Sequence, residues 1–248
     1  MVTSLKKSPT KPESLSLEKC TVRLSLKKSR AAILPERTVE ASDSLLHLFK
    51  DLLLPFPRIL SFASFGTEID TAPLNRLLAK RGQLFLPKIA GNDLQIFHLS
   101  DLNRQLAPNS LGILEPIVDR CERVAPDQLS LILVPALGFD RHHTHRDSRI
   151  GNFANPGDPD LKPAKQPISA GDMGDTAGFK DGDAGAPKNS SIELRCVYHR
   201  IGYGKGFYDR LLQSLPLCPT YGIGFTEQLI DRLPISDQDI ALSELFLF

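Results

Sequence analysis

The stretch from Arg200 to Arg210 combines small and charged residues in the pattern of an anion-binding loop. Its glycines alternate, at Gly202, Gly204 and Gly206. Such glycines let a backbone approach an anion closely, and the helical run that follows would direct its free N–H groups at it. Lys205 adds a mobile positive charge, and Asp209 is placed to hold a divalent cation beside phosphate oxygens. We predict a phosphate cradle; a plain glycine-rich turn is the alternative, because neither the P-loop nor the dinucleotide-binding pattern is present.

A basic stripe is expected on one face of a helix near the N-terminus. Its members are Lys19, Arg23, Lys27 and Arg30. Like charges one helical turn apart repel one another, so the stripe favours an external anion that relieves the repulsion. A solvated basic face is the commoner explanation of such a pattern. A phosphate site nearby would reverse that preference.

The segment from Phe65 to Thr71 lies at the end of a predicted strand and leads into a helix. Open α/β sheets bind their ligands at such strand ends. Glu68 in this segment could fix an NH-rich heterocycle through paired hydrogen bonds. Taken alone, it is as well explained as a surface acid near the start of a helix.

Apolar periodicity predicts which elements position these residues. Helices are expected at about 17–32, 43–54, 73–81 and 227–232, and strands at 58–64, 84–89, 94–99, 129–134, 221–225 and 245–248. The continuous apolar run at 129–134 is typical of a central parallel strand. The alternation predicts an α/β fold whose mostly parallel sheet is covered by helices on both faces.

The sequence predicts one domain, residues 17–248, after a disordered tail at residues 1–16. An insertion at about 141–198 interrupts this domain, because much of that segment lacks apolar periodicity and cannot bury enough surface to fold by itself. His142, His143 and His145 fall within it. Structural zinc requires tetrahedral closure by a fixed set of ligands, so we interpret these histidines as part of a solvated loop.

The composition limits the partners of the chain. A formal net charge of +1 over 248 residues provides no strong field for nucleic acid or a membrane surface, and we predict neither partner. No apolar stretch is long enough to span a bilayer, and the N-terminus lacks a secretory signal. The scattered cysteines fit reduced thiols. We expect a cytoplasmic monomer, with organellar targeting left open.

A series of motifs along the chain resembles the 5-formyltetrahydrofolate cyclo-ligase family, also called methenyltetrahydrofolate synthetase. The motifs are Lys19-x-x-x-Arg23, Gly66-Thr-Glu-Ile-Asp-Thr71, Leu86-Pro-Lys88, Leu111-Gly-Ile-Leu-Glu-Pro116, Leu133-Val-Pro-Ala-Leu-Gly-Phe-Asp140 and the glycine-rich loop. The resemblance covers nearly everything from Lys19 to the end, except the insertion. The most specific elements are the Val-Pro-x-Leu-x-Phe-Asp motif and the glycine-rich loop with Phe-Tyr-Asp-Arg after it.

This resemblance implies a single Rossmann-like α/β domain that binds Mg-ATP and 5-formyltetrahydrofolate in one cleft. The implied ATP contacts are Lys19, Arg23, Arg200, Gly202, Gly204, Lys205, Gly206 and Tyr208. The implied folate contacts are Ala63, Glu68, Tyr203 and Phe207. Asp209 and Asp239 match the magnesium carboxylates, and Lys88 matches a position that adds a phosphate contact.

The implied reaction is an ATP-dependent cyclisation that forms 5,10-methenyltetrahydrofolate, ADP and phosphate. The formyl oxygen attacks the γ-phosphate of ATP, N10 closes on the activated carbon, and phosphate leaves. Catalysis would then rest on positioning and on neutralising phosphate charge, with Lys205 and Arg200 as the catalytic cations.

Two features depart from the family pattern. The long insertion stands directly before the glycine-rich loop, and Ser243 occupies a position where relatives often carry an acid. A flexible excursion costs little loop-closure entropy, so activity can survive the insertion. Retained Asp239 leads us to expect that metal binding persists.

Two other functions stay open. The first is a non-catalytic folate- or nucleotide-binding module of the same family, which would not need Glu68, Lys205, Asp209 and Asp239 together. The second is a sugar-phosphate isomerase or acyl-CoA transferase on a related sheet, which would use a carboxylate as acid, base or nucleophile and would not need ATP.

Overall fold

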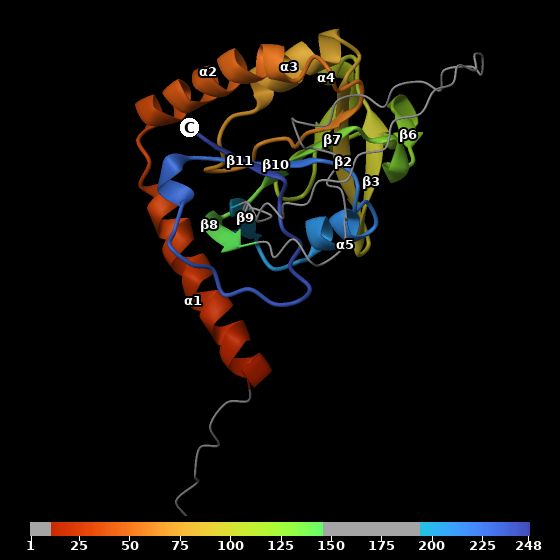
Figure 1. Ribbon diagram of the computed structural model, residues 1–248. Helices are drawn as coiled ribbons and strands as arrows, with labels where there is room; N and C mark the ends of the chain where they lie inside the picture. Colours follow the sequence, from red (N-terminus) through yellow and green to blue (C-terminus); the bar gives the residue numbers. More distant parts are fainter. Residues whose placement is uncertain (1–10, 146–193) are drawn as a thin grey trace, which may run out of the picture.

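Short apolar strands that alternate with helices build a central sheet (Figure 1). The computed structural model describes residues 11–145 and 194–248. Within them the strands of the main sheet are β1 (Ile59–Leu60), β2 (Leu84–Ala90), β3 (Asp93–His98), β6 (Glu122–Val124), β7 (Leu131–Pro135), β10 (Thr220–Gly224) and β11 (Glu244–Leu247). Their order across the sheet is β11-β10-β7-β1-β2-β3-β6.

The sheet is mostly parallel, as predicted. The pairs β11 with β10, β10 with β7, β7 with β1 and β1 with β2 run parallel. Only the pairs of β2 with β3 and of β3 with β6 run antiparallel within this sheet. β7 lies in the interior of the sheet, between β10 and β1, and its residues are mostly buried, as expected for an apolar run covered on both faces.

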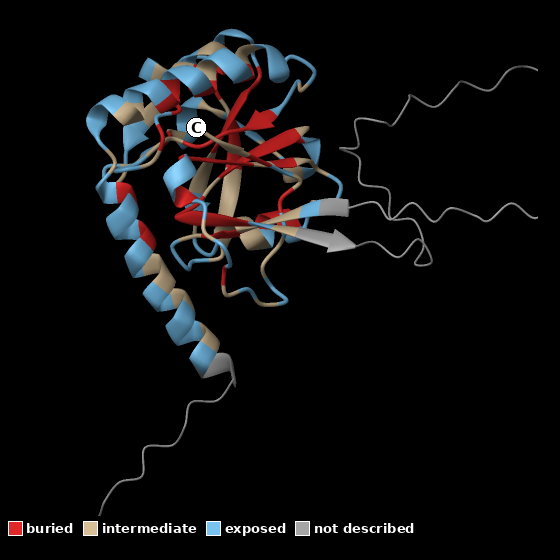
Figure 2. Cartoon of the chain, turned by 60° about the vertical axis from the view of Figure 1, so that its left-hand side comes forward, coloured by how far each residue is buried: buried red, intermediate tan, exposed pale blue. Residues whose placement is uncertain are grey.

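Successive residues of the central strands serve two different cores. Ile59, Leu131 and Leu133 point to one face and pack with helices α2 (Pro35–Leu52) and α3 (Ala72–Lys80). Leu60 and Ile132 point to the other face and pack with helix α5 (Phe207–Gln213). This alternation follows from the pleat of a strand. The buried residues accordingly concentrate in the central strands, with helices on both sides of them (Figure 2).

Two helices begin earlier than the sequence pattern indicated. Helix α1 runs over Lys11–Ala31, so residues 11–16 are helical and the predicted disordered tail is wrong for them; residues 1–10 lie outside the described residues. Helix α2 begins at Pro35, not at Ser42 or Asp43. Proline suits the first helical position because its fixed φ matches the helix and its missing N–H would have been unpaired there. Ser42 is instead buried and donates to the Asp70 carbonyl oxygen.

A hairpin occupies both ends of the predicted insertion. Strands β8 (Gly138–His145) and β9 (Leu194–Ile201) pair antiparallel, from Gly138 opposite Ile201 to His145 opposite Leu194. The predicted limits of the irregular insertion, residues 141 and 198, were therefore wrong, because residues 141–145 and 194–198 are paired strands. Inter-strand hydrogen bonds satisfy the backbone of these residues, so they form strands without a large apolar core. His142, His143 and His145 accordingly lie in a strand and not in an irregular loop. Residues 146–193 lie outside the described part of the chain.

Smaller elements complete the fold. They are the short helix α4 (Leu102–Gln105), the hairpin of β4 (Leu106–Pro108) with β5 (Leu114–Pro116), and the 3-10 turns η1 (Val118–Arg120), η2 (Pro126–Gln128) and η3 (Thr226–Gln228). The helix predicted at 227–232 is therefore only a single 3-10 turn. Among the described residues, no helix combines the length and apolar character needed to cross a membrane.

Helix α1 attaches to the rest of the fold through a small third core. Leu26 packs with Leu137, Ile201 and Leu233, which come from the segments around the β8–β9 hairpin. The fit is tight at Gly138, because a Cβ there would stand 2.5 Å from a methyl carbon of Leu26. This contact sets the basic face of α1 against the glycine-rich loop.

Candidate active site

A cavity of ≈ 610 Å³ opens beyond the carboxyl ends of β1 and β7. Phe62 and Ala63 reach it just after β1, and Pro135 reaches it at the end of β7. Helix α1 and the glycine-rich loop form further walls. This is the place where open α/β sheets bind ligands, and the volume is typical of a small-molecule site.

The glycine-rich loop requires its glycines for the backbone. Gly204 has φ +95° and Gly206 has φ +66°, both in the left-handed region that other residues rarely adopt. Gly206 is also the N-cap of α5, so the loop delivers the chain directly into the helix. Lys205 lies between these two glycines and lines the cavity. The structure therefore shows the geometry that the alternating glycines predicted.

A buried arginine joins the loop to the C-terminal segment. Arg200 Nη2 donates to Asp209 Oδ1 at 2.7 Å, and its Nη1 donates to the Ile240 carbonyl oxygen at 2.6 Å. Its side chain is 5% exposed, whereas that of Asp209 is 33% exposed. Burial lowers the pKa of Arg200 from its ordinary value, and the charges of Asp209 and Asp239 oppose that shift. The guanidinium thus presents positive charge at the cavity wall while two acids stabilise it.

Lys19 and Asp239 form a second pair at the same wall. Lys19 Nζ lies 2.5 Å from Asp239 Oδ2, which also accepts hydrogen bonds from the backbone N–H and the hydroxyl of Ser236. Burial raises the pKa of Asp239, but the bonds from Lys19 and Ser236 outweigh it and hold the pKa below the ordinary value. Asp239 is therefore an ionised carboxylate at neutral pH.

The basic stripe of α1 faces the loop, but the protein itself uses much of its charge. Arg23 Nε donates to the Gly202 carbonyl oxygen at 2.9 Å. Lys27 Nζ lies 5.3 Å from the centre of the Tyr203 ring. The stripe is therefore not a simple solvated face, because the glycine-rich loop packs across it, and its contact with an external anion stays a prediction.

Arg30 is the most deeply buried member of the basic stripe. It is 4% exposed and donates to Thr67 Oγ1, to the Ala136 carbonyl oxygen and to the Tyr203 hydroxyl. Its Nη1 lies 4.0 Å from Glu68 Oε1. Arg30 therefore lies in the protein interior behind the cavity wall and connects the segments that form this wall.

Glu68 lines the cavity near this arginine. Its Oε2 accepts a hydrogen bond of 3.1 Å from the backbone N–H of Phe65. Burial raises the pKa of Glu68, and the Phe65 N–H and Arg30 offset only part of that shift. Burial likewise raises the pKa of Tyr208, with a contribution from the charge of Glu68, so its hydroxyl stays protonated. The site therefore offers both an acid and a hydroxyl to a polar ligand.

One part of the cavity lining is apolar. Phe62, Ile89, Leu94, Leu111, Ile113 and Leu114 contribute to it. Leu111 is 67% exposed, so part of this surface is open to solvent. A ligand that carries phosphates at one end and a flat heterocycle at the other would match the two sides.

Most of the candidate residues of the sequence analysis line this one cavity, and Lys27, Arg30 and Lys88 do not. The set comprises Lys19, Arg23, Ala63, Glu68, Arg200, Gly202, Tyr203, Gly204, Lys205, Gly206, Phe207, Tyr208, Asp209 and Asp239. Their individual roles stay predictions. Lys88 does not belong to the lining and forms an ion pair of 3.1 Å with Glu115.

Glu115 is a cavity residue for which the sequence suggested no role. It is buried, lines the cavity, and accepts hydrogen bonds from Lys88 and from the Asn109 side chain. Its place in the Leu111–Pro116 motif is the feature of the sequence that could have indicated a role in the cavity.

The two aspartates fit a Mg²⁺ ion that accompanies phosphates. Asp209 uses Oδ1 and Asp239 uses Oδ2 for protein contacts. Among the described residues, the other oxygen of each carboxylate has no protein partner. Mg²⁺ commonly takes one or two carboxylates together with phosphate oxygens and water, which is the donor set available here.

Comparison with known proteins agrees with the motifs. The sequence model of the 5-formyltetrahydrofolate cyclo-ligase family matches residues 16–152. The protein named 5-formyltetrahydrofolate cyclo-ligase from Escherichia coli (strain K12) is 23% identical over 231 residues, which cover 88% of this chain and 93% of that protein.

Solved structures show the same fold. The 5,10-methenyltetrahydrofolate synthetase of Aquifex aeolicus matches with a TM-score of 0.62 and 22% identity, over 92% of this chain and 88% of that one. The synthetase of Mycoplasma pneumoniae matches with a TM-score of 0.56 and 15% identity, over 92% of this chain and 97% of that one. Since the family model spans more than half of its length, the chain belongs to the 5-formyltetrahydrofolate cyclo-ligase family.

Proposed function

We propose that this chain is an enzyme that converts 5-formyltetrahydrofolate to 5,10-methenyltetrahydrofolate, with ATP hydrolysed to ADP and phosphate. Family membership supports the reaction class. The observation that carries the proposal is that the candidate residues for ATP, folate and metal, except Lys88, line a single cavity, although they come from distant parts of the chain. Cytoplasmic location and a monomeric state stay predictions from the sequence.

The loop side of the cavity would take the triphosphate. Gly202, Gly204 and Gly206 let the backbone approach phosphate oxygens, and Lys205 and Arg200 add positive charge. Lys19 and Arg23 contribute charge from α1. Mg²⁺ held by Asp209 and Asp239 would neutralise further phosphate charge when bound.

The apolar side would take the reduced folate. Glu68 can accept hydrogen bonds from the NH groups of a pterin, and the Phe207 ring can pack against it. Ala63 and Tyr203 complete this contact surface. Binding both substrates in one cavity brings the formyl oxygen towards the γ-phosphate, and such positioning removes much of the entropic barrier.

The chain's own residues would then serve the transfer by electrostatics. Negative charge spreads over the phosphoryl oxygens as the formyl oxygen attacks, and the cations Lys205 and Arg200 stabilise that charge. N10 then closes on the activated carbon and phosphate leaves. No covalent intermediate with the protein is needed.

The test follows the absorbance of methenyltetrahydrofolate as purified protein, 5-formyltetrahydrofolate, ATP and Mg²⁺ are mixed. We expect a rise that requires ATP. Asp209→Asn should raise the Mg²⁺ concentration needed for half-maximal rate, whereas Asp237→Asn, an exposed acid outside the cavity lining, should not.

Two outcomes would contradict the proposal. A folded protein that binds 5-formyltetrahydrofolate without consuming ATP would identify a binding module of the same family. Turnover of a sugar phosphate or an acyl-CoA without ATP would identify the second alternative. In either case the cavity would have been assigned to the wrong chemistry.

A further inference from the structure

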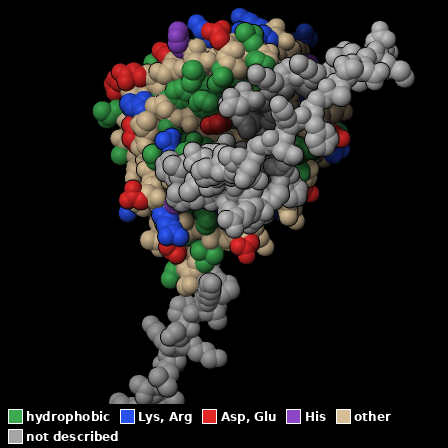
Figure 3. All heavy atoms as spheres, in the orientation of Figure 1, with side chains coloured by type: hydrophobic (Ala, Val, Ile, Leu, Met, Phe, Trp, Pro, Cys, Tyr) green, Lys and Arg blue, Asp and Glu red, His purple; other side chains and the backbone are tan. Residues whose placement is uncertain are grey.

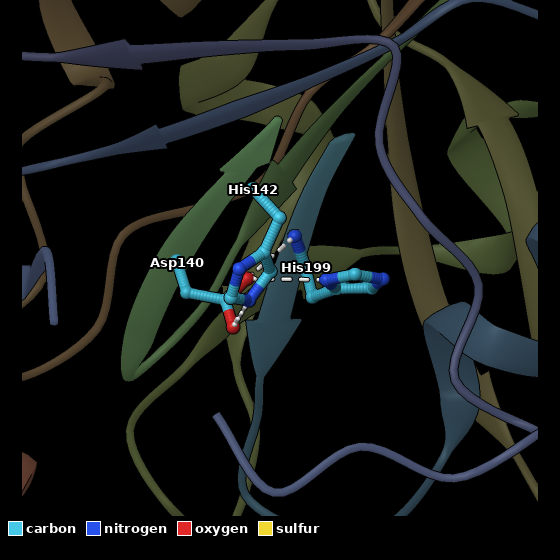
Figure 4. Close-up of side chains that lie close together, drawn as sticks. All are labelled: Asp140, His142 and His199. Atoms are coloured by element: carbon cyan, nitrogen blue, oxygen red, sulfur yellow. Dashed lines mark hydrogen bonds and ion pairs between the residues drawn. The ribbon is translucent and has the colours of Figure 1, made fainter. Parts of the chain in front are cut away.

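Three potential metal ligands meet at the β8–β9 hairpin, away from the cavity described above. They are Asp140 and His142 of β8 and His199 of β9 (Figure 4). His142 Nε2 lies 2.7 Å from Asp140 Oδ2, and His199 Nδ1 lies 3.1 Å from Asp140 Oδ1. One ligand atom from each residue lies within 4.8 Å of the other two.

The hairpin register explains why these side chains meet. Asp140 stands directly opposite His199 in the antiparallel pair. His142 follows two positions later on β8, so it shares the face of Asp140 and is a diagonal neighbour of His199. The ligands therefore come from two strands that stand on either side of residues 146–193.

The cluster has the donor types of a transition-metal site. Imidazole nitrogens and a carboxylate oxygen are ligands of zinc, and three protein ligands leave a further position for water. Two atoms bound tetrahedrally at about 2.0–2.1 Å from one zinc ion lie about 3.3 Å apart. The distance of 2.7 Å to Oδ2 would need to grow by about 0.6 Å and that of 3.1 Å to Oδ1 by about 0.2 Å, and ligand atoms that now lie within 4.8 Å of one another would need to close around the ion.

The charge of the cluster also favours a cation. Asp140 is fully buried, and it accepts backbone N–H bonds from Leu233 and His199 in addition to its contacts with the two rings. Burial raises its pKa, but the bonds from Leu233 and His142 outweigh that effect and hold the pKa below the ordinary value. The carboxylate is therefore charged at neutral pH, as a metal ligand must be.

The two imidazole rings lie with their centres 5.7 Å apart. A divalent ion bound between the two rings and the carboxylate would offset the negative charge of the buried Asp140. The His142 side chain is 31% exposed, which gives an ion access from solvent.

The cluster is separate from the cavity. Arg200 follows His199 directly and lines the cavity, and neighbouring residues of a strand point to opposite faces. None of the three residues of the cluster lines that cavity. A metal here would not compete with the Mg²⁺ carboxylates.

We propose that Asp140, His142 and His199 form a zinc-class metal site that ties β8 to β9. The ion joins the two strands immediately before Arg200 and the glycine-rich loop. With three protein ligands the ion keeps one further position for water, and it holds the hairpin on which the loop is mounted. The proposal does not depend on the substrate of the cavity.

The test measures Zn²⁺ binding to the full chain with no affinity tag. The protein is stripped with a chelator, desalted, and titrated with Zn²⁺ against a chromogenic competitor. We expect one equivalent to bind, and a higher thermal midpoint with Zn²⁺ present, because a ligand that binds only the folded state stabilises it. Cobalt substitution should give visible bands of a low-coordinate site.

The decisive comparison uses variants of the ligands. His142→Gln and the double variant His142→Gln/His199→Gln should each weaken Zn²⁺ binding at least tenfold. His47→Gln removes an exposed histidine of α2 and should bind as the wild type does. Circular dichroism without metal shows whether each variant folds. If the double variant does not fold, the single variant His142→Gln still tests the site, because His142 is partly exposed and its replacement should be tolerated.

Unchanged Zn²⁺ affinity in His142→Gln would overturn the proposal, as would the absence of Zn²⁺ binding to the wild type at micromolar concentration. The cluster would then be only a hydrogen-bonded anchor of the hairpin. In that case replacing His199 would lower stability equally with and without metal.

Discussion

Lys19 Nζ lies 2.5 Å from Asp239 Oδ2 and joins residues that stand 220 positions apart. The contact ties the first helix to the segment before the last strand, and both residues line the cavity. Both side chains are largely buried, at 16% and 20% exposure, so solvent screens the pair only in part. It therefore helps to hold both ends of the chain around the site.

A double-mutant cycle of Lys19→Met and Asp239→Asn should give a coupling energy of about 1 kcal/mol at pH 7. Asp239 has a lowered pKa in the folded state, so its contribution is complete above the ordinary aspartate pKa of about 3.9 and is lost as the pH falls through the folded value. Urea unfolding between pH 7 and about pH 3 measures this. A stability difference between the wild type and Lys19→Met that persists unchanged in acid would contradict the assignment.

Glu68→Gln should raise the free energy of unfolding at neutral pH and lower activity. Burial raises the pKa of Glu68, so the folded state binds this proton more tightly than the unfolded state does. Stability contributed by the group is present below the ordinary glutamate pKa of about 4.3 and is lost as pH rises through the folded value. The gain of the variant should therefore appear at pH 7 and disappear near pH 4, which thermal unfolding at both pH values checks.

The same variant tests the proposed role of Glu68 towards folate. A neutral amide has one acceptor oxygen and one donor NH₂ group, so it cannot accept one hydrogen bond on each of two oxygens as a carboxylate can. The KM for 5-formyltetrahydrofolate should rise while the KM for ATP stays close to that of the wild type. A change in the KM for ATP alone would contradict a contact between Glu68 and folate.

Gly204→Ala should lower the free energy of unfolding by about 1–2 kcal/mol, because a Cβ is strained at φ +95°. The added carbon would also stand 3.2 Å from the Arg23 guanidinium carbon. Gly202→Ala is the matched control for stability, since its φ is not in the left-handed region and no described heavy atom lies within 4 Å of the added Cβ. Equal losses in the two variants, measured by urea unfolding, would refute the argument.

Lys205→Met should lower kcat/KM for ATP by about 10²–10³-fold, the usual effect of removing one group that stabilises transition-state charge. Lys205 is exposed on the loop, so stability should change little. Lys80→Met, at the exposed end of α3 and outside the cavity lining, is the control. Steady-state rates at varied ATP decide, and similar rates for all three proteins would exclude a catalytic role for Lys205.

Local patterns in the sequence were enough to predict the fold class and to nominate the site residues, whose roles stay predictions. The apolar run around Leu131–Pro135 can be buried only as a central strand, and the alternating glycines before α5 permit only a loop with left-handed residues. These are local signals, because propensity and periodicity act over a few residues. The motifs nominated the candidate residues, and most of these line one cavity in the folded chain.

Only the tertiary structure decided how the charged side chains are used. Arg30 and Lys19 look alike in a basic stripe, yet Arg30 is buried by Tyr203 and Thr67 while Lys19 meets Asp239. His142 looks like part of an irregular segment, yet pairing of β8 with β9 sets it beside Asp140 and His199. Such contacts join residues far apart in the chain, so their partners are set by strand register and helix packing, which no local pattern encodes.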